Sequence, residues 1–217
     1  PDFQSAAQAL ETLIPVDIMG LTVNRQRYGF LTNDAGGIMD DLMLANRGDH
    51  ILVVVNAACK SDDIAHLKAN LSDCTVTEIT DRALLALQGP ASAAVLAALD
   101  PAAAEMRFMD VAVLSLDGVA CWVSRSGYTG EDGYEISVPA HQATALAERL
   151  LAHPDVAPIG LGARDSLRLE AGLCLYGHDI DTLTTPIQAA LNWAIQNVRR
   201  RDGAREGGFP GAPVILD

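Results

Sequence analysis

The chain has 217 residues and a formal net charge of −13, with 49% hydrophobic and 20% charged residues. This composition is typical of a globular protein with one large core or two smaller ones. The negative charge argues against nucleic acid or an anionic membrane as the main partner. No apolar run reaches the roughly 18 residues that a membrane span needs. No signal or transit peptide is recognisable.

Cysteine and histidine usage argues against disulfides and metal. The four cysteines stand far apart without a CxxC spacing, which indicates a reducing compartment rather than a disulfide framework or a zinc site. The five histidines share no ligand spacing, so we predict no metal site. Serine lacks a G-x-S-x-G elbow, and no cysteine has the surroundings of an activated thiol.

Hydrophobic periodicity predicts the elements of the first third of the chain. They are a helix over 5–14 with Ser5 as N-cap, strands over 21–31, 38–46 and 51–56, a helix from Ser61 to about 71, and a short strand over 75–80. The strands are joined by Gly-rich or Asp-rich turns, which favours antiparallel neighbours.

The remaining chain alternates strands with amphipathic helices. We expect strands over 83–87, 111–116, 119–125 and 133–138, and helices over 91–99, 140–151, 163–173 and 185–194, followed by a mobile polar tail over 199–208. The boundary between two groups of elements is expected near residues 80–85. These elements predict an α+β fold with mixed and antiparallel sheets and packed helices, and they argue against a doubly wound sheet.

The stretch Asn33–Leu44 contains a turn of Asn, Asp and Gly residues followed by two adjacent acids within an apolar strand. Because side chains alternate along a strand, Asp40 and Asp41 point to opposite faces, and whichever face is buried takes a carboxylate with it. A buried acid needs a partner or a task. The pattern alone leaves open which of the two is functional.

Other motifs are weaker signals. Residues 124–135 hold three glycines and three acids, and a polar turn between strands explains them as well as a site does; without a following Lys a P-loop is excluded. Gly160–Gly162 favours a helix cap over a dinucleotide fingerprint. On the next helix, the spacing of Glu170 fits a functional role and a structural ion-pair network with Arg164 and Arg168 equally well. The run Arg199–Arg201 is an anion site or, more often in such cases, a solvated face.

Six segments in sequence order resemble the T-protein family of the glycine cleavage system, the tetrahydrofolate-dependent aminomethyltransferases. They are Tyr28–Leu31 with Gly36–Leu42, Val54–Ala57, Leu87–Pro90, Gly127–Ile136, Gly160–Gly177 and Phe209–Ala212. The resemblance covers nearly the whole chain. It implies a three-domain cloverleaf fold, with residues 1–84 in the second domain and 85–217 forming most of the first. The family's N-terminal segment and its C-terminal β-rich domain are expected to be absent, so that this fragment itself is expected to catalyse little.

The resemblance also implies the reaction. An aminomethyl group on the lipoyl arm of the H-protein passes to tetrahydrofolate with release of ammonia, without a metal, in the bacterial cytoplasm or the eukaryotic mitochondrial matrix. Alternatives are a folate-dependent demethylase acting on dimethylglycine, sarcosine or a sulfonium compound, and a folate-binding fragment without turnover.

Residue roles carry over position by position. The resemblance implies that Asp41 is the catalytic acid. Strand alternation then places Met43 on the same face of the strand as Asp41, with Asp40 pointing away. The resemblance further implies that Tyr28 and Asn56 line the folate pocket, that Glu170 binds the pterin, and that Arg199 faces the glutamate tail of folate.

Overall fold

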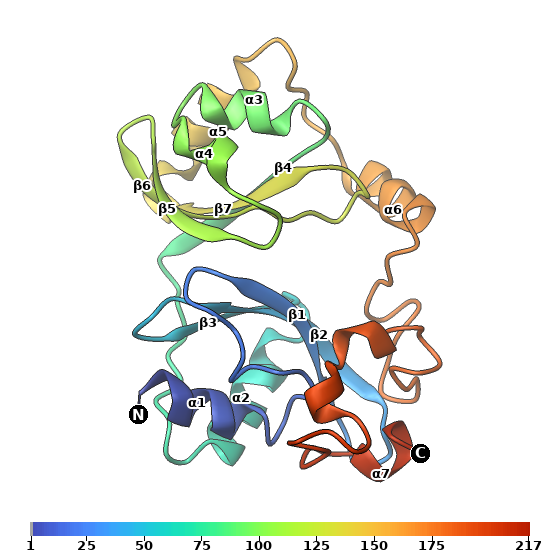
Figure 1. The fold of residues 1–217 in the computed structure, drawn as a ribbon. Coiled ribbons are helices and arrows are strands. Elements are labelled where there is room, and N and C mark those ends of the chain that lie inside the picture. Colours follow the sequence, from blue (N-terminus) through green and yellow to red (C-terminus); the bar gives the residue numbers. More distant parts are fainter. Residues whose placement is uncertain (1) are drawn as a thin grey trace. The chain divides into compact units, whose positions relative to one another are not determined.

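The computed structural model describes residues 2–217, which form two compact units (Figure 1). Unit 1 comprises the chain up to Glu78 together with Cys174–Asp217, and unit 2 comprises Ile79–Leu173. Both units combine antiparallel strands with helices, as the α+β prediction requires. In the part of the chain that the structure describes, no helix is long and apolar enough to cross a membrane.

Unit 1 contains a three-stranded antiparallel sheet in the order β1-β2-β3. Its elements are α1 (Phe3–Leu10), β1 (Gln26–Thr32), β2 (Ile38–Asn46), β3 (Ile51–Val55), α2 (Lys60–Asn70), the 3₁₀ turns η2 (Asn192–Ala194) and η3 (Asn197–Arg199), and α7 (Ala212–Ile215). The side chain of Asn33 fixes the β1–β2 hairpin by accepting hydrogen bonds from the backbone N–H groups of Ala35 and Gly37 at 3.0 and 2.9 Å. Gly36 there has a φ of 86°, which favours glycine.

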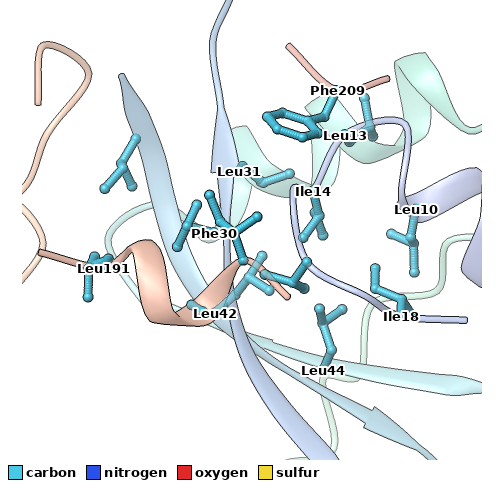
Figure 2. Packing of buried hydrophobic residues seen from close by; sticks show 14 of the residues in the cluster. Leu10, Leu13, Ile14, Ile18, Phe30, Leu31, Leu42, Leu44, Leu191 and Phe209 are labelled. Atoms are coloured by element: carbon cyan, nitrogen blue, oxygen red, sulfur yellow. The ribbon is translucent and has the colours of Figure 1, made fainter. Parts of the chain in front are cut away.

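The core of unit 1 joins the two ends of the chain. Phe30, Leu42 and Leu44 of the sheet pack with Ile14 after α1 and with residues of the C-terminal segment such as Phe209 (Figure 2). The burial of β2 alternates from Ile38 to Leu44, so that its even-numbered residues face this core. The C-terminal segment therefore completes a core that the N-terminal strands begin.

Unit 2 is a four-stranded antiparallel sheet in the order β4-β7-β6-β5 with helices against it (Figure 1). Its elements are β4 (Arg82–Gln88), α3 (Ser92–Ala97), α4 (Ala102–Glu105), β5 (Val111–Leu116), β6 (Val119–Ser124), β7 (Gly133–Pro139), the 3₁₀ turn η1 (Ala140–Gln142), α5 (Ala143–Leu151) and α6 (Leu161–Glu170). Leu96, Leu146 and Leu150 of the helices pack on Val123 and Ile136 of the sheet to form a separate core.

The predicted division into residues 1–84 and 85–217 differs from these compact units. A boundary after residue 84 falls inside β4, and Cys174–Asp217 belongs with the N-terminal segment because its apolar side chains enter the core of unit 1. Sequence periodicity cannot show such a return, since it reports which residues are buried and not against which part of the chain.

Several predicted elements were wrong in detail. Residues 75–80 form no strand, because β-branched residues need a neighbouring strand to pair with. The strand expected from residue 21 begins only at Gln26, after Asn24 with a φ of 61°, and the helix expected over 185–194 is replaced by turns around Ala190, whose φ is 56°. Helix α1 ends at Leu10 and is capped by Asp2 rather than Ser5, since the Asp2 carboxylate accepts from the Ser5 N–H at 2.8 Å.

Candidate functional site

The predicted site residues fall in both units. Tyr28 on β1, Asp41 and Met43 on β2, and Asn56 immediately after β3 belong to the sheet of unit 1. Glu170 is the last residue of α6 in unit 2. The structure therefore brings together the candidates on the small sheet, and it is there that the geometry of a site can be built.

The carboxylate of Asp41 is held by one hydrogen bond on each oxygen. The Tyr28 hydroxyl donates to Oδ2 at 3.0 Å, and the side-chain amide of Asn56 donates to Oδ1 at 2.7 Å. Tyr28 reaches it from β1 and Asn56 from the residue just after β3, because β2 lies between these two strands in the sheet. Asp41 lies on the half-buried face of β2 and not on the core face.

Asn56 also binds the neighbouring acid. Its side-chain Nδ2 donates to Oδ1 of Asp40 at 2.8 Å, and its backbone N–H donates to Oδ2 of Asp40 at 3.1 Å. Asp40 is fully buried on the core face. One asparagine thus connects the two acids that strand alternation sends to opposite faces, and it orients Asp41 from behind.

Burial raises the pKa of Asp41, against the lowering effect of its hydrogen bonds from Asn56 and Tyr28, while the charge of Asp40 raises it further. A carboxyl with a raised pKa is a stronger base than an ordinary aspartate. Residues perturbed in this way are concentrated at functional sites. The role of Asp41 as the reactive acid stays a prediction, and its half-buried position with a raised pKa agrees with it.

Met43 occupies the same half-buried face of β2 as Asp41, two residues further along. It lies opposite Tyr28 on β1 and Val54 on β3 in the strand register. This position agrees with the predicted wall of a pocket. Its contact with a ligand remains a prediction.

Trp193 is an additional candidate that the sequence analysis missed. Its ring stacks on Tyr28 with centroids 5.5 Å apart and planes inclined at 22°, while 59% of the residue is exposed. Trp193 comes from η2 in the C-terminal segment, far from Tyr28 along the chain. The incorrectly expected helix over 185–194 concealed it, since a tryptophan within an apolar helix would indicate only core packing.

We expect Tyr28→Phe to slow the reaction at Asp41 by roughly tenfold, the effect of losing one hydrogen bond to a charged acceptor. The phenyl ring keeps the stack on Trp193, so the fold is preserved. The pKa of Asp41 should rise further, because the hydroxyl stabilises the charged form. Carbon-detected NMR titration of Asp41 together with rate measurements checks this, and an unchanged pKa would contradict the orienting role.

Arg199 does not fit the predicted anchor for a folate tail. Its guanidinium is 4% exposed and donates to the backbone oxygens of Glu11 and Arg205 at 2.6 and 2.9 Å. The carboxylate of Glu11, equally buried, lies 3.4 Å from its Nη1 and also pairs with Arg205 at 3.0 Å. These contacts assign Arg199 to a buried ion-pair network between the end of α1 and the C-terminal segment. The tail predicted to be mobile over 199–208 is therefore packed at Arg199 and Arg205.

In unit 2, Glu170 is exposed at the end of α6, whereas Glu135 on β7 has the more perturbed environment. Burial raises the pKa of Glu135, opposed by a hydrogen bond from the Ser126 hydroxyl at 3.4 Å and by the charge of Arg164. Arg164 lies over the ring of Tyr128, 4.5 Å from its centroid. The sequence offered a signal for this group, namely the acids and glycines of residues 124–135 followed by a charged helix.

The structural reading of α6 is partly confirmed. Asp165 accepts from Arg168 at 2.8 Å, so this pair neutralises itself, and Gly160 is the N-cap of the helix as the capping interpretation expected. Across residues 2–217 there is no group of three or more His, Cys, Asp or Glu side chains placed to hold a metal ion.

Comparison with known proteins identifies the family. The model of the GCVT N-terminal domain matches residues 4–199. The chain belongs to the GCVT N-terminal domain family. The family resemblance drawn from the six sequence segments is thereby confirmed.

Individual members of the family agree in sequence and structure. The chain is 44% identical to the mitochondrial aminomethyltransferase of Dictyostelium discoideum, over 94% of this chain and 54% of that protein. It is 46% identical to the human mitochondrial aminomethyltransferase, over 95% and 53%. The crystal structure of glycine cleavage system aminomethyltransferase T from Bartonella henselae superimposes with a TM-score of 0.88 at 42% identity, covering 99% of this chain and 58% of that one. This match confirms the α+β fold class. The chain spans about half the length of the curated relatives it matches.

Proposed function

We propose that this GCVT N-terminal domain protein transfers an aminomethyl group from a lipoyl carrier, the H-protein, to tetrahydrofolate. The observation that carries the proposal is the half-buried carboxyl of Asp41, held on both oxygens by Tyr28 and Asn56. The names of the relatives, which are aminomethyltransferases, support the same reaction. The mitochondrial location in those names applies to this chain only if its source is eukaryotic; a bacterial chain would act in the cytoplasm.

In the proposed reaction the carbon between the lipoyl sulfur and the amino nitrogen exchanges both of its heteroatom bonds. Its bonds to nitrogen and to sulfur break, and it forms two new bonds to nitrogens of tetrahydrofolate. The two protons displaced from those nitrogens leave on ammonia and on the lipoyl thiol. The products are methylene-tetrahydrofolate, ammonia and the dihydrolipoyl carrier, so no external oxidant or reductant is needed.

Asp41 has an electrostatic and a basic task in this scheme. Its carboxylate positions the attacking amine and stabilises the positive charge that develops as the iminium-like carbon is transferred. Its raised pKa makes it a better proton acceptor from that amine than an ordinary aspartate. Tyr28 and Asn56 supply the fixed geometry, which would otherwise have to be created at each turnover.

The pterin-binding acid is open to a paired test. Glu170 is the residue that the resemblance implies, whereas the burial, the raised pKa and the charged neighbour favour Glu135. We expect Glu135→Gln to weaken tetrahydrofolate binding by roughly tenfold through loss of a charge-assisted hydrogen bond. Glu170→Gln serves as the matched variant on an exposed site. Calorimetric titration of tetrahydrofolate into both variants decides between the two acids. If only Glu170→Gln weakens binding, Glu170 is the pterin-binding acid that the resemblance implies.

Turnover distinguishes the proposal from its alternatives. The protein is mixed with H-protein carrying the aminomethyl-lipoyl group and with tetrahydrofolate, and methylene-tetrahydrofolate and ammonia are measured. Tetrahydrofolate binding without product would favour a folate-binding protein without turnover. Consumption of dimethylglycine, sarcosine or a sulfonium compound in place of the loaded carrier would favour a demethylase.

A further inference from the structure

Two acids lie in the core of unit 1 behind Asp41. Asp40, on the core face of β2, is fully buried, and Asp63, in the first turn of α2, is 3% exposed. Their side chains are within hydrogen-bond reach of each other. A carboxylate without a compensating partner is costly in such a place.

Cations do not compensate this pair. Within residues 2–217 no Lys, Arg or His forms an ion pair with Asp40 or Asp63, and the nearest lysine in sequence, Lys60, pairs with Glu78 at 3.0 Å. The oxygens of Asp40 accept from Asn56, as described above. In contrast, Oδ2 of Asp63 is buried and has no hydrogen-bond donor to accept from. An ionised Asp63 would therefore face both an empty acceptor and a neighbouring acid.

We propose that Asp63 is a positioning residue that carries a proton and donates it in a hydrogen bond to Asp40, thereby fixing Asn56 against Asp41. A protonated carboxyl is a donor, so the proton turns a contact between two acceptors into a hydrogen bond. The chain of contacts runs from Asp63 through Asp40 and Asn56 to Asp41. This inference rests on the proposed function only where it concerns the rate.

The surroundings of Asp63 favour its protonated form at neutral pH. Burial, the side-chain hydrogen bond with Asp40, and the charges of Asp40 and Asp62 together raise the pKa of Asp63 to about 8. The start of α2 opposes this with its positive dipole end, yet burial and the acidic neighbours outweigh it. The other titratable groups at the cluster, Cys59 and Tyr176, have pKa values raised to about 12 and stay neutral.

Side-chain NMR of the aspartate carboxyl carbons tests the proton directly and needs no turnover. We expect Asp63 to titrate near pH 8. Asp63→Asn should remove that titration. Asp62→Asn is the matched control, because it removes a charge from the same turn and should leave the Asp63 titration in place. Asp63 ionised at pH 6 would overturn the proposal, whatever the outcome of the transfer assay.

Stability gives a second readout with a definite sign. The folded state holds the Asp63 proton to about pH 8, whereas an unfolded aspartate releases it near its ordinary pKa of 3.8. Stability from this group is thus fully present below about pH 4 and is lost as the pH rises towards 8. Asp63→Asn should flatten that decline in urea unfolding, and Asp62→Asn should not. An unchanged pH slope in Asp63→Asn contradicts the shared proton.

The rate separates positioning from mere packing. Asn at position 63 still donates to Asp40, so Asp63→Asn should keep the transfer rate at pH 7 and extend activity above pH 8. Asp63→Ala lacks the donor and should lower kcat by roughly tenfold with little change in KM. If Asp63→Asn is as slow as Asp63→Ala while the NMR titration holds, the proton is present but does not position Asn56.

Discussion

Asp41→Asn should reduce aminomethyl transfer by at least about 100-fold, the effect of removing a preorganised electrostatic group from a reacting centre. Tetrahydrofolate should still bind, because the amide has the same size and can still contact Tyr28 and Asn56. The measurement is a transfer assay combined with folate titration by calorimetry. Asp34→Asn, at the exposed hairpin before β2, is the control for loss of one negative charge.

The pH dependence of the wild-type protein provides an independent check on Asp41. Because the pKa of Asp41 is raised by burial and the carboxylate is the active form, the rate should increase as the pH rises through that pKa. This limb should vanish in Asp41→Asn. A loss of folate affinity that matches the loss of rate would refute a mainly catalytic role and make Asp41 a binding residue.

Asn56→Ala should damage both stability and rate. The variant removes the amide that joins the two acids, so Asp40 loses one of its hydrogen-bond donors and Asp41 loses the donor to its Oδ1, while the Tyr28 hydroxyl still donates to its Oδ2. A buried carboxyl deprived of a donor costs about 3 kcal/mol. Urea unfolding should show this loss, and transfer should slow by roughly tenfold or more because Asp41 is no longer held from behind.

Asn46→Ala is the matched control for that experiment. Asn46 is a buried asparagine at the end of β2, and its amide donates to the Leu21 backbone oxygen at 2.7 Å, without contact with either acid. It should lower stability by a similar amount and leave the rate per folded molecule unchanged. If both variants slow transfer equally, the effect of Asn56 is only structural.

The arrangement of the candidate residues on the small sheet was largely predictable from sequence. Strand alternation separated Asp40 from Asp41, the turn residues defined where β2 starts, and the family resemblance selected Asp41. What the pattern could not supply was the partner of each acid. Asn56 is 15 residues from Asp41 along the chain, and its double contact depends on the register of β3 against β2, which periodicity does not fix.

Errors arose where long-range packing decided the outcome. The family resemblance assigned Arg199 to the glutamate tail of folate, whereas in the structure its guanidinium pairs with the buried carboxylate of Glu11, 188 positions earlier in sequence. The expected helix over 185–194 had suitable composition, but Ala190 adopts a positive φ and the segment serves as turns that deliver Trp193 to Tyr28. Local propensity is a weak prior whenever a segment is needed for tertiary contacts.

The discontinuous core of unit 1 has a consequence for how the protein is made. Its N-terminal strands leave the ribosome well before Leu191 and Phe209, which cover their apolar face. At ordinary translation speeds this interval is on the order of 10 s, whereas the contiguous unit 2 can complete its own core meanwhile. The nascent N-terminal sheet is therefore the segment most exposed to chaperones and to misassembly during synthesis, and premature termination after Leu173 would leave Asp41 on an uncovered sheet.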